Sequence, residues 1–102
     1  MNLRRVVVTG LGAVSPNGIG REAYWQATRN GVSGTGPLAL FDGSMLSFRV
    51  AAEVKGFDFD RYLTKKDKDR VQRAVPMASF ATEEAAKDAG LDFESLTAIE
   101  RE

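Results

Sequence analysis

Two glycines near the start of the chain, Gly10 and Gly12, form a pattern that is often associated with phosphate binding. A Gly-x-Gly turn after a strand allows backbone amides to approach the pyrophosphate of a dinucleotide. The full fingerprint also needs a third glycine, where this chain has Ser15, and an acidic residue at the end of the next strand. Residues 30–34 have neither a strand pattern nor an acid. We therefore favour a structural strand-to-helix turn over nucleotide binding, and a cofactor titration would separate the two.

A cluster of basic residues lies between positions 61 and 73. Six lysines and arginines stand there against Asp67 and Asp69, an excess of four positive charges in a chain whose formal net charge is zero. A local patch of this kind can attract and orient an acidic partner. A solvated helix face without a partner explains the pattern equally well, because runs of charge are usually surface. The zero net charge gives no indication of binding to nucleic acid or to an anionic membrane.

The chain has no cysteine and no histidine. It therefore offers no thiolate nucleophile, no thiolate metal ligand, no disulfide and no imidazole for acid–base chemistry. No stretch reaches the length that a membrane span needs, and the arginine-led N-terminus lacks the cleavage site of a signal peptide. We predict no cofactor, no metal and no membrane association, with the cytoplasm as the default location.

The elements that would position these residues have an α/β pattern, and 102 residues make at most one small domain. The β-branched run Val6–Val8 predicts a short central strand, covered on both faces, that turns into a helix. That helix is predicted over residues 20–29, with Asn17 or Gly18 as its cap and a stop at residues 30–31. Trp25 is predicted to face the core.

The second half of the chain alternates irregular and regular segments. A loop is predicted over residues 31–44, a short strand over 48–54 and a single turn over 57–63. Thr64 predicts the N-cap of a short helix. Because proline is tolerated only in the first turn of a helix, Pro76 predicts the start of a second helix that stops at Gly90.

The predicted second helix has two faces of different character. Alanines at helical spacing, whose small side chains permit close approach of a neighbouring element, are Ala78, Ala81, Ala85 and Ala89. Glu83 and Lys87 are four residues apart, which predicts an ion pair on the exposed face.

These motifs occur in an order that resembles the N-terminal segment of a β-ketoacyl-acyl carrier protein synthase, of the kind that elongates fatty acids. Each motif alone is weak, but the ordered set is specific and covers essentially the whole chain. It consists of Arg5–Pro16, Gly18, Trp25, Gly31–Gly34, Phe41-Asp42, Phe57–Leu63, Lys66-Asp67 and Ala85–Leu91.

The resemblance implies a thiolase-like fold, in which two related halves of α/β/α layers enclose an active site. Residues 1–102 would be the incomplete N-terminal part of that ketosynthase domain, truncated before the catalytic region. The implied reaction has two stages. A cysteine first takes up the acyl chain as a thioester, and two histidines then assist decarboxylation of a malonyl thioester and hold the enolate oxygen. Because this chain has neither residue type, it is predicted to be inactive alone.

The resemblance also implies partners. In relatives, basic residues aligned with positions 65–70 contact the acidic acyl carrier protein, which makes Lys65, Lys66, Lys68 and Arg70 candidate docking residues, although Asp69 stands where a base is expected. The remainder of the ketosynthase chain is a second implied partner. A homodimer of the full-length enzyme is the third.

Three interpretations of function remain open. The first is the N-terminal portion of an acyl-condensing enzyme of fatty-acid or polyketide synthesis. The second is a non-catalytic, truncated relative that acts only by association with a full-length ketosynthase subunit. The third, an unrelated nucleotide-binding module, is disfavoured by Ser15. Since another core strand would begin near Glu102 in relatives, we expect the isolated polypeptide to fold poorly or to aggregate.

Overall fold

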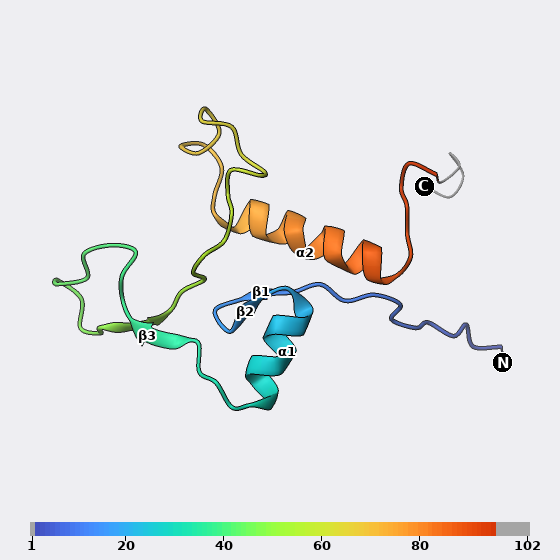
Figure 1. Ribbon diagram of the computed structural model, residues 1–102, viewed down its shortest axis with the longest axis horizontal. Helices are drawn as coiled ribbons and strands as arrows, with labels where there is room; N and C mark the ends of the chain where they lie inside the picture. Colours follow the sequence, from blue (N-terminus) through green and yellow to red (C-terminus); the bar gives the residue numbers. More distant parts are fainter. Residues whose placement is uncertain (1, 96–102) are drawn as a thin grey trace.

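The computed structural model describes residues 2–95, and they contain two helices and two small antiparallel sheets (Figure 1). Strands β1 (Val14–Ser15) and β2 (Gly18–Ile19) form the first sheet and lead into helix α1 (Arg21–Arg29). Strands β3 (Thr35–Pro37) and β4 (Val50–Ala52) form the second sheet, and helix α2 (Ala74–Asp88) follows. The prediction of a mixed α/β chain is confirmed. The core strand that was expected to begin near Glu102 lies outside the described residues.

A hairpin stands between the glycine-rich turn and α1. Val14 lies opposite Ile19 and Ser15 opposite Gly18, so the chain reverses over two residues before the helix begins. The predicted helix over residues 20–29 is confirmed to within one residue. Its stop is confirmed as well, because Gly31 has φ 68°, a conformation that costs glycine nothing.

The predicted caps of α1, Asn17 and Gly18, are wrong. The N-cap residue is Gly20, which has φ 96° and no side chain with which to bond the first amides. The missing side-chain cap is supplied by another element: the carboxylate of Glu84 in α2 accepts a hydrogen bond from the amide of Arg21 at 2.9 Å. The side chain of Asn17 instead donates to the carbonyl of Val32 at 3.1 Å.

Helix α2 begins and ends as the sequence predicts. Pro76 lies in its first turn, where a missing N–H breaks no helical hydrogen bond, and Gly90 with φ 72° follows its last turn. The alanine face also has a close neighbour, as its small side chains predict. Gly10 packs against the backbone at residues 85–89, and a Cβ built at Gly12 would overlap the carbonyl oxygen of Ala81. Only glycine permits this approach of an extended segment to a helix.

The predicted central strand at Val6–Val8 is wrong for the described chain. These residues are extended and pair with no other strand among residues 2–95, and their exposed fractions are 92, 67 and 80%. A strand exists only through backbone hydrogen bonds to a neighbouring strand. The nearest element is α2, which contacts the chain further on, at the glycines (Figure 1). Helix backbone has no free amides to offer, so the valine run stays unpaired.

The only apolar side chain that is buried among residues 2–95 is Pro76, so the predicted core position of Trp25, which is 56% exposed, is also wrong. The Cα radius of gyration is 17.9 Å, whereas a globular domain of this length has about 13 Å. Helix α1 contacts chiefly the hairpin β1–β2, which is too small to cover an indole. Packing is therefore local, and polar contacts join the elements.

The second sheet carries the one buried carboxylate of the described chain. Thr35 pairs with Ala52 in this sheet, which confirms the predicted strand within residues 48–54. Glu53 follows at once, is 8% exposed, and accepts the amides of Leu40 at 2.9 Å and Ala39 at 3.1 Å. The amide of Leu40 above all lowers the pKa of Glu53 below its ordinary value of 4.5, because it bonds only the ionised form well.

Candidate functional site

Residues 61–73, here called the basic segment, connect the second sheet to the N-terminal end of α2 (Figure 1). The segment consists of turns, so the short helix predicted from Thr64 is wrong. The carboxylate of Asp67 accepts both the hydroxyl and the amide of Thr64, the latter at 3.3 Å. Bonds of this local kind stabilise a turn as well as a helix start, and here they close the turn.

All four predicted docking residues lie exposed within six positions of this segment. Lys68 forms an ion pair with Asp60. No side-chain hydrogen bond or ion pair joins Lys65, Lys66 or Arg70 to another residue in the described part of the chain. The four cations thus lie exposed in one short segment of turns, and three of them have no side-chain partner in the described part of the chain. That they bind a partner stays a prediction.

An aromatic cluster attaches the basic segment to α2. The ring of Phe57 lies edge-on to Phe59 with centroids 4.8 Å apart, and edge-on to Phe80 of α2 at 5.8 Å. Tyr62 stacks on Phe57 at 6.1 Å. The turn predicted over residues 57–63 is confirmed by the amides of Tyr62 and Leu63, which both bond to the carbonyl of Phe59. Aromatic pairs of this geometry contribute about 0.5–1.5 kcal/mol each beyond the area that they bury.

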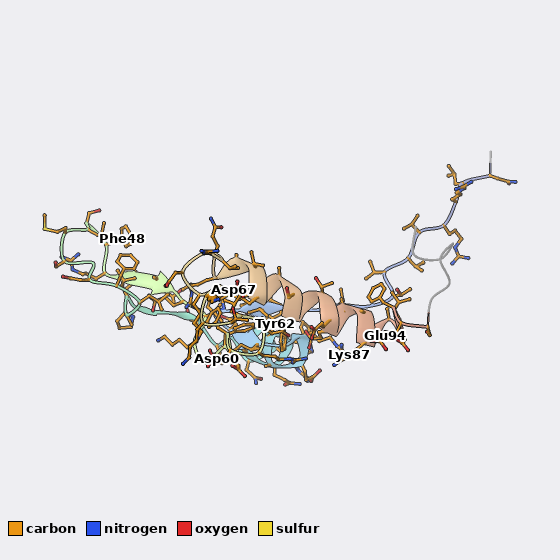
Figure 2. All side chains as sticks on the ribbon, turned by 90° about the horizontal axis from the view of Figure 1, so that it is seen from above. Phe48, Asp60, Tyr62, Asp67, Lys87 and Glu94 are labelled. Atoms are coloured by element: carbon orange, nitrogen blue, oxygen red, sulfur yellow. The ribbon has the colours of Figure 1, made fainter. Side chains whose placement is uncertain are left out.

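A carboxylate of α2 completes this attachment. Glu83 accepts a hydrogen bond from Arg61 at 2.9 Å and one from the Tyr62 hydroxyl at 3.2 Å. The predicted pair of Glu83 with Lys87 is therefore wrong, and Figure 2 shows Lys87 nearer than Tyr62 to the C-terminal end of α2. Partial burial, followed by the bond to Glu83, raises the pKa of Tyr62 above its ordinary 10.0. The hydroxyl donates this bond to the Glu83 carboxylate.

A cavity of about 210 Å³ opens within the basic segment. Its lining combines three apolar side chains, Phe59, Leu63 and Val71, with two cations, Lys68 and Arg73. The Arg73 guanidinium lies over the Phe59 ring, 4.7 Å from its centroid, and donates to the carbonyl of Val54 at 3.3 Å. Sequence reasoning missed this cavity and the part that Arg73 plays in it.

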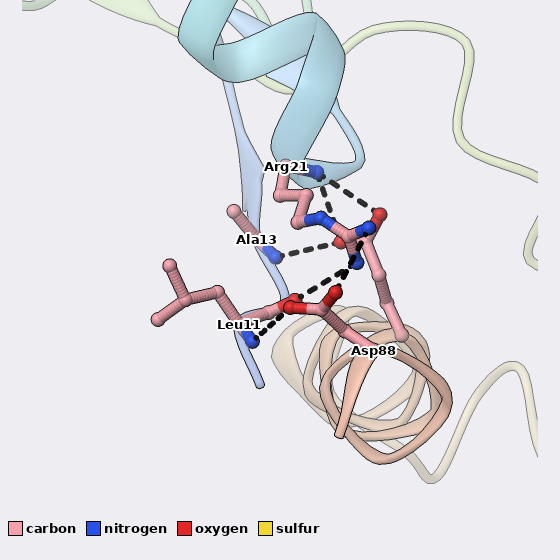
Figure 3. A network of polar contacts seen from close by, with 5 residues as sticks. Leu11, Ala13, Arg21 and Asp88 are labelled. Carbon is pink, nitrogen blue, oxygen red and sulfur yellow. Dashed lines mark hydrogen bonds and ion pairs between the residues drawn. The ribbon is translucent and has the colours of Figure 1, made fainter. Parts of the chain in front are cut away.

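A second polar cluster joins the glycine-rich segment to α2 (Figure 3). Glu84 accepts the amides of Ala13 and Arg21 at 3.0 and 2.9 Å. Asp88 accepts the amide of Leu11 at 3.0 Å and pairs with the Arg21 guanidinium at 3.1 Å, as Figure 3 shows. Both carboxylates accept backbone amides, and Asp88 also pairs with an arginine. These bonds hold the glycine-rich segment against α2 at the edge of an open cavity of about 470 Å³.

Two further kinds of site, a metal centre and a membrane span, are absent from the described residues. Within residues 2–95 no three histidine, cysteine, aspartate or glutamate side chains gather as metal ligands. Neither described helix combines the length and the apolarity that crossing a membrane requires. The basic segment is therefore the strongest candidate for a functional surface.

Comparison with known proteins identifies relatives along nearly the whole chain. The family model described as "Beta-ketoacyl synthase, N-terminal domain" matches residues 3–100. The 3-oxoacyl-[acyl-carrier-protein] synthase 2 of Synechocystis sp. is 41% identical over 97 residues, which are 95% of this chain and 23% of that protein. The synthase of the same name from Staphylococcus aureus is 37% identical over 95 residues, 93% of this chain and 23% of the relative.

A third relative comes from Streptomyces halstedii, and its name assigns it provisionally to the polyketide beta-ketoacyl synthases. It is 44% identical over 92 residues, 87% of this chain and 21% of the relative. The chain thus spans between a fifth and a quarter of the length of these curated relatives. The family match covers far more than half of the chain, and it agrees with the order of motifs in the sequence. The chain belongs to the beta-ketoacyl synthase family, and residues 3–100 correspond to its N-terminal domain.

Proposed function

We propose that this chain is the N-terminal portion of an acyl-condensing enzyme of fatty-acid or polyketide synthesis. The observation that carries the proposal is the match of residues 3–100 to the family's N-terminal domain. In the proposed reaction a malonyl thioester on acyl carrier protein loses CO₂, and the resulting enolate attacks an acyl thioester and displaces the thiolate. A cysteine and two histidines would serve this chemistry, and this sequence contains neither residue type. Residues 1–102 therefore contribute scaffold and surface to the reaction.

The proposal also covers the fold and the oligomeric state of the complete enzyme. A thiolase-like α/β/α arrangement, completed by the remainder of the domain, would cover the apolar side chains that residues 2–95 leave exposed. The exposed valines at positions 6–8 and Trp25 are the clearest examples, because each has more than half of its surface in water. Dimerisation of the complete enzyme belongs to this proposal as well.

The specific contribution of the basic segment is to dock acyl carrier protein, which is acidic. Lys65, Lys66 and Arg70 support this role because they are exposed and have no partner within the described chain. Lys68 lies beside them and is held by Asp60. Cations that are grouped in one short segment increase the rate of encounter with an acidic protein and orient it. The zero net charge of the chain confines this attraction to the segment.

Charge reversal tests the docking role. In the native-length enzyme, Lys66→Glu and Arg70→Glu should each raise the KM for acyl carrier protein by about fivefold or more and leave kcat unchanged, because the contact precedes the chemistry. Lys87→Glu is the matched control, since Lys87 is an exposed lysine of α2 that lies outside the basic segment. Equal KM values for all three variants would refute docking at this segment.

A non-catalytic role by association with a full-length ketosynthase subunit is the second candidate. The observation that favours it is the absence of cysteine and histidine from the sequence, together with the exposed apolar surface. The intact mass of the native polypeptide, measured together with co-purification, decides between the two. A heavier chain with condensing activity supports the enzyme. A native chain of 102 residues that co-purifies with a ketosynthase supports the associating subunit.

A further inference from the structure

We propose that Glu83 of α2 is a positioning residue for the docking of acyl carrier protein, because it holds the start of the basic segment against the helix. The inference rests on the docking role proposed above and deepens it. In this role Glu83 acts through the turns that carry Lys65, Lys66 and Arg70, and it makes no contact with the carrier protein itself.

The basic segment has no helix or strand of its own and consists of turns. Turns with exposed backbone open easily unless contacts with other elements hold them. At its C-terminal end the segment continues into α2, and Arg73 donates to the carbonyl of Val54 at 3.3 Å. The position of the docking cations therefore depends on what holds the other end.

Two side chains at the start of the segment converge on one carboxylate oxygen. The Arg61 guanidinium donates to Oε2 of Glu83 at 2.9 Å, and the Tyr62 hydroxyl donates to the same oxygen at 3.2 Å. The guanidinium also lies over the Tyr62 ring, 5.2 Å from its centroid. Because Glu83 lies in the second half of α2 and the segment ends where the helix begins, these bonds fold the start of the segment back along the helix.

Attachment at both ends prepares the segment for a partner. The edge-on contact of Phe57 with Phe80 already holds the preceding turn, and Glu83 extends this attachment to the two residues that begin the segment. A loop that is ordered before binding loses less conformational entropy when a partner docks. Glu83 thus contributes to docking through the order of the turns.

The negative charge of Glu83 makes this role distinguishable from long-range electrostatics. A carboxylate beside the basic segment opposes the attraction of an acidic protein, so its removal should strengthen binding if net charge alone decides. Its removal should weaken binding if position decides, because the turns lose an attachment. The two explanations therefore predict changes of opposite sign.

Substitution of Glu83 in the native-length enzyme tests the inference, with the KM for acyl carrier protein and kcat as readouts. Glu83→Ala removes both the acceptor and the charge, and it should raise the KM about threefold at unchanged kcat. Glu83→Gln retains a carbonyl oxygen that can accept both bonds, so its KM should stay at or below that of the wild type. Tyr62→Phe removes one donor without changing any charge and should raise the KM about twofold.

Asp69→Ala is the matched control. Asp69 is an exposed residue of the basic segment, and its carboxylate accepts no hydrogen bond or ion pair from another described residue. The substitution removes the same charge as Glu83→Ala but no attachment, so it should lower the KM for acyl carrier protein. The melting temperature of every variant is measured alongside.

The outcomes distinguish the inference from the docking role on which it rests. A KM of Glu83→Ala at or below the wild-type value, with a raised KM in Lys66→Glu, overturns the positioning role and retains docking. Wild-type KM values in both Lys66→Glu and Arg70→Glu overturn docking and the inference with it. An equal rise in Glu83→Gln and Glu83→Ala assigns the effect to the charge, and a kcat that falls with the melting temperature at unchanged KM assigns Glu83 to stability alone; each overturns the inference. If Glu83→Ala does not fold, Tyr62→Phe decides.

Discussion

The isolated 102-residue polypeptide should show no cooperative thermal unfolding. Pro76 is the only apolar side chain that is buried among residues 2–95, and the valine run at positions 6–8 pairs with no described strand. Cooperative unfolding of a small domain arises from a shared core whose contacts are lost together. The experiment uses residues 1–102 alone, and the comparison is a polypeptide that contains the complete family domain.

The accessible surface supplies the magnitude. It is 8510 Å², whereas a folded monomer of 11.1 kDa exposes about 5,700 Å². The excess of roughly 2,800 Å² has the size of an obligate interface. If about half of it is apolar, covering it would contribute on the order of 35 kcal/mol at about 25 cal/mol per Å². Net stabilities are about 5–15 kcal/mol, so residues 1–102 cannot lose this contribution and remain cooperatively folded.

Calorimetry and dye binding measure the consequence. The isolated polypeptide should give no heat-absorption peak, whereas a cooperative domain of this length absorbs about 60–80 kcal/mol at its midpoint. It should also bind a fluorescent apolar dye, because its large hydrophobic side chains are exposed. Replacing Val6, Val7 and Val8 by threonine should reduce dye binding and aggregation.

A sharp calorimetric transition without dye binding would refute this reasoning. It would mean that the chain forms a core of its own, with an arrangement of elements different from the one described. A concentration-dependent midpoint is a separate case, because it would show that a second copy covers the apolar surface. The two results are separated by repeating the scan over a tenfold range of protein concentration.

Three further predictions concern the native-length polypeptide. Gly12→Ala should destabilise it by about 1–3 kcal/mol in urea unfolding, because its Cβ overlaps a carbonyl of α2, whereas Gly36→Ala, with open space around it, should be neutral. Glu84→Ala should speed hydrogen exchange at the amide of Arg21, and Glu84→Gln, which keeps an acceptor, should do so less. Glu53 has a lowered pKa in the folded state, so its contribution is complete above pH 4.5 and is lost as the pH falls through the folded value. Protection from hydrogen exchange at the amides of Ala39 and Leu40, which bond to Glu53, should therefore fall as the pH decreases below 4.5. Glu53→Gln should remove this pH dependence.

Local patterns in the sequence predicted the extents of α1 and α2, although not the cap of α1, and they also predicted a helix from Thr64 where the chain forms turns. The stops at Gly31 and Gly90 depend on backbone conformations that only glycine adopts freely, and the place of Pro76 depends on its missing N–H. The alanine face of α2 was also predictable, because small residues at helical spacing imply a close neighbour. The identity of that neighbour, the segment with Gly10 and Gly12, was not predictable from either motif alone.

Contacts between distant residues account for the failures. The cap of α1 comes from Glu84, which lies 63 residues from Arg21 in the sequence, and no local rule connects the two. The predicted strand at residues 6–8 has the right composition, but pairing depends on a neighbour that the described chain does not provide. Glu83 reaches Arg61 in place of Lys87 because the aromatic cluster brings the basic segment to α2. Spacing along one helix cannot reveal such competition.

The charges explain why a neutral chain can present a cationic docking surface. Acidic side chains of α2 have partners within the chain: Glu84 and Asp88 accept backbone amides, and Glu83 accepts a hydrogen bond from Arg61. Within and beside the basic segment, Asp67 is occupied by Thr64 and Asp60 by Lys68. Carboxylates that are occupied in this way hold the fold, while unpaired lysines and arginines remain in water. The attraction for an acidic protein is local, because the six cations of the basic segment outnumber its two aspartates.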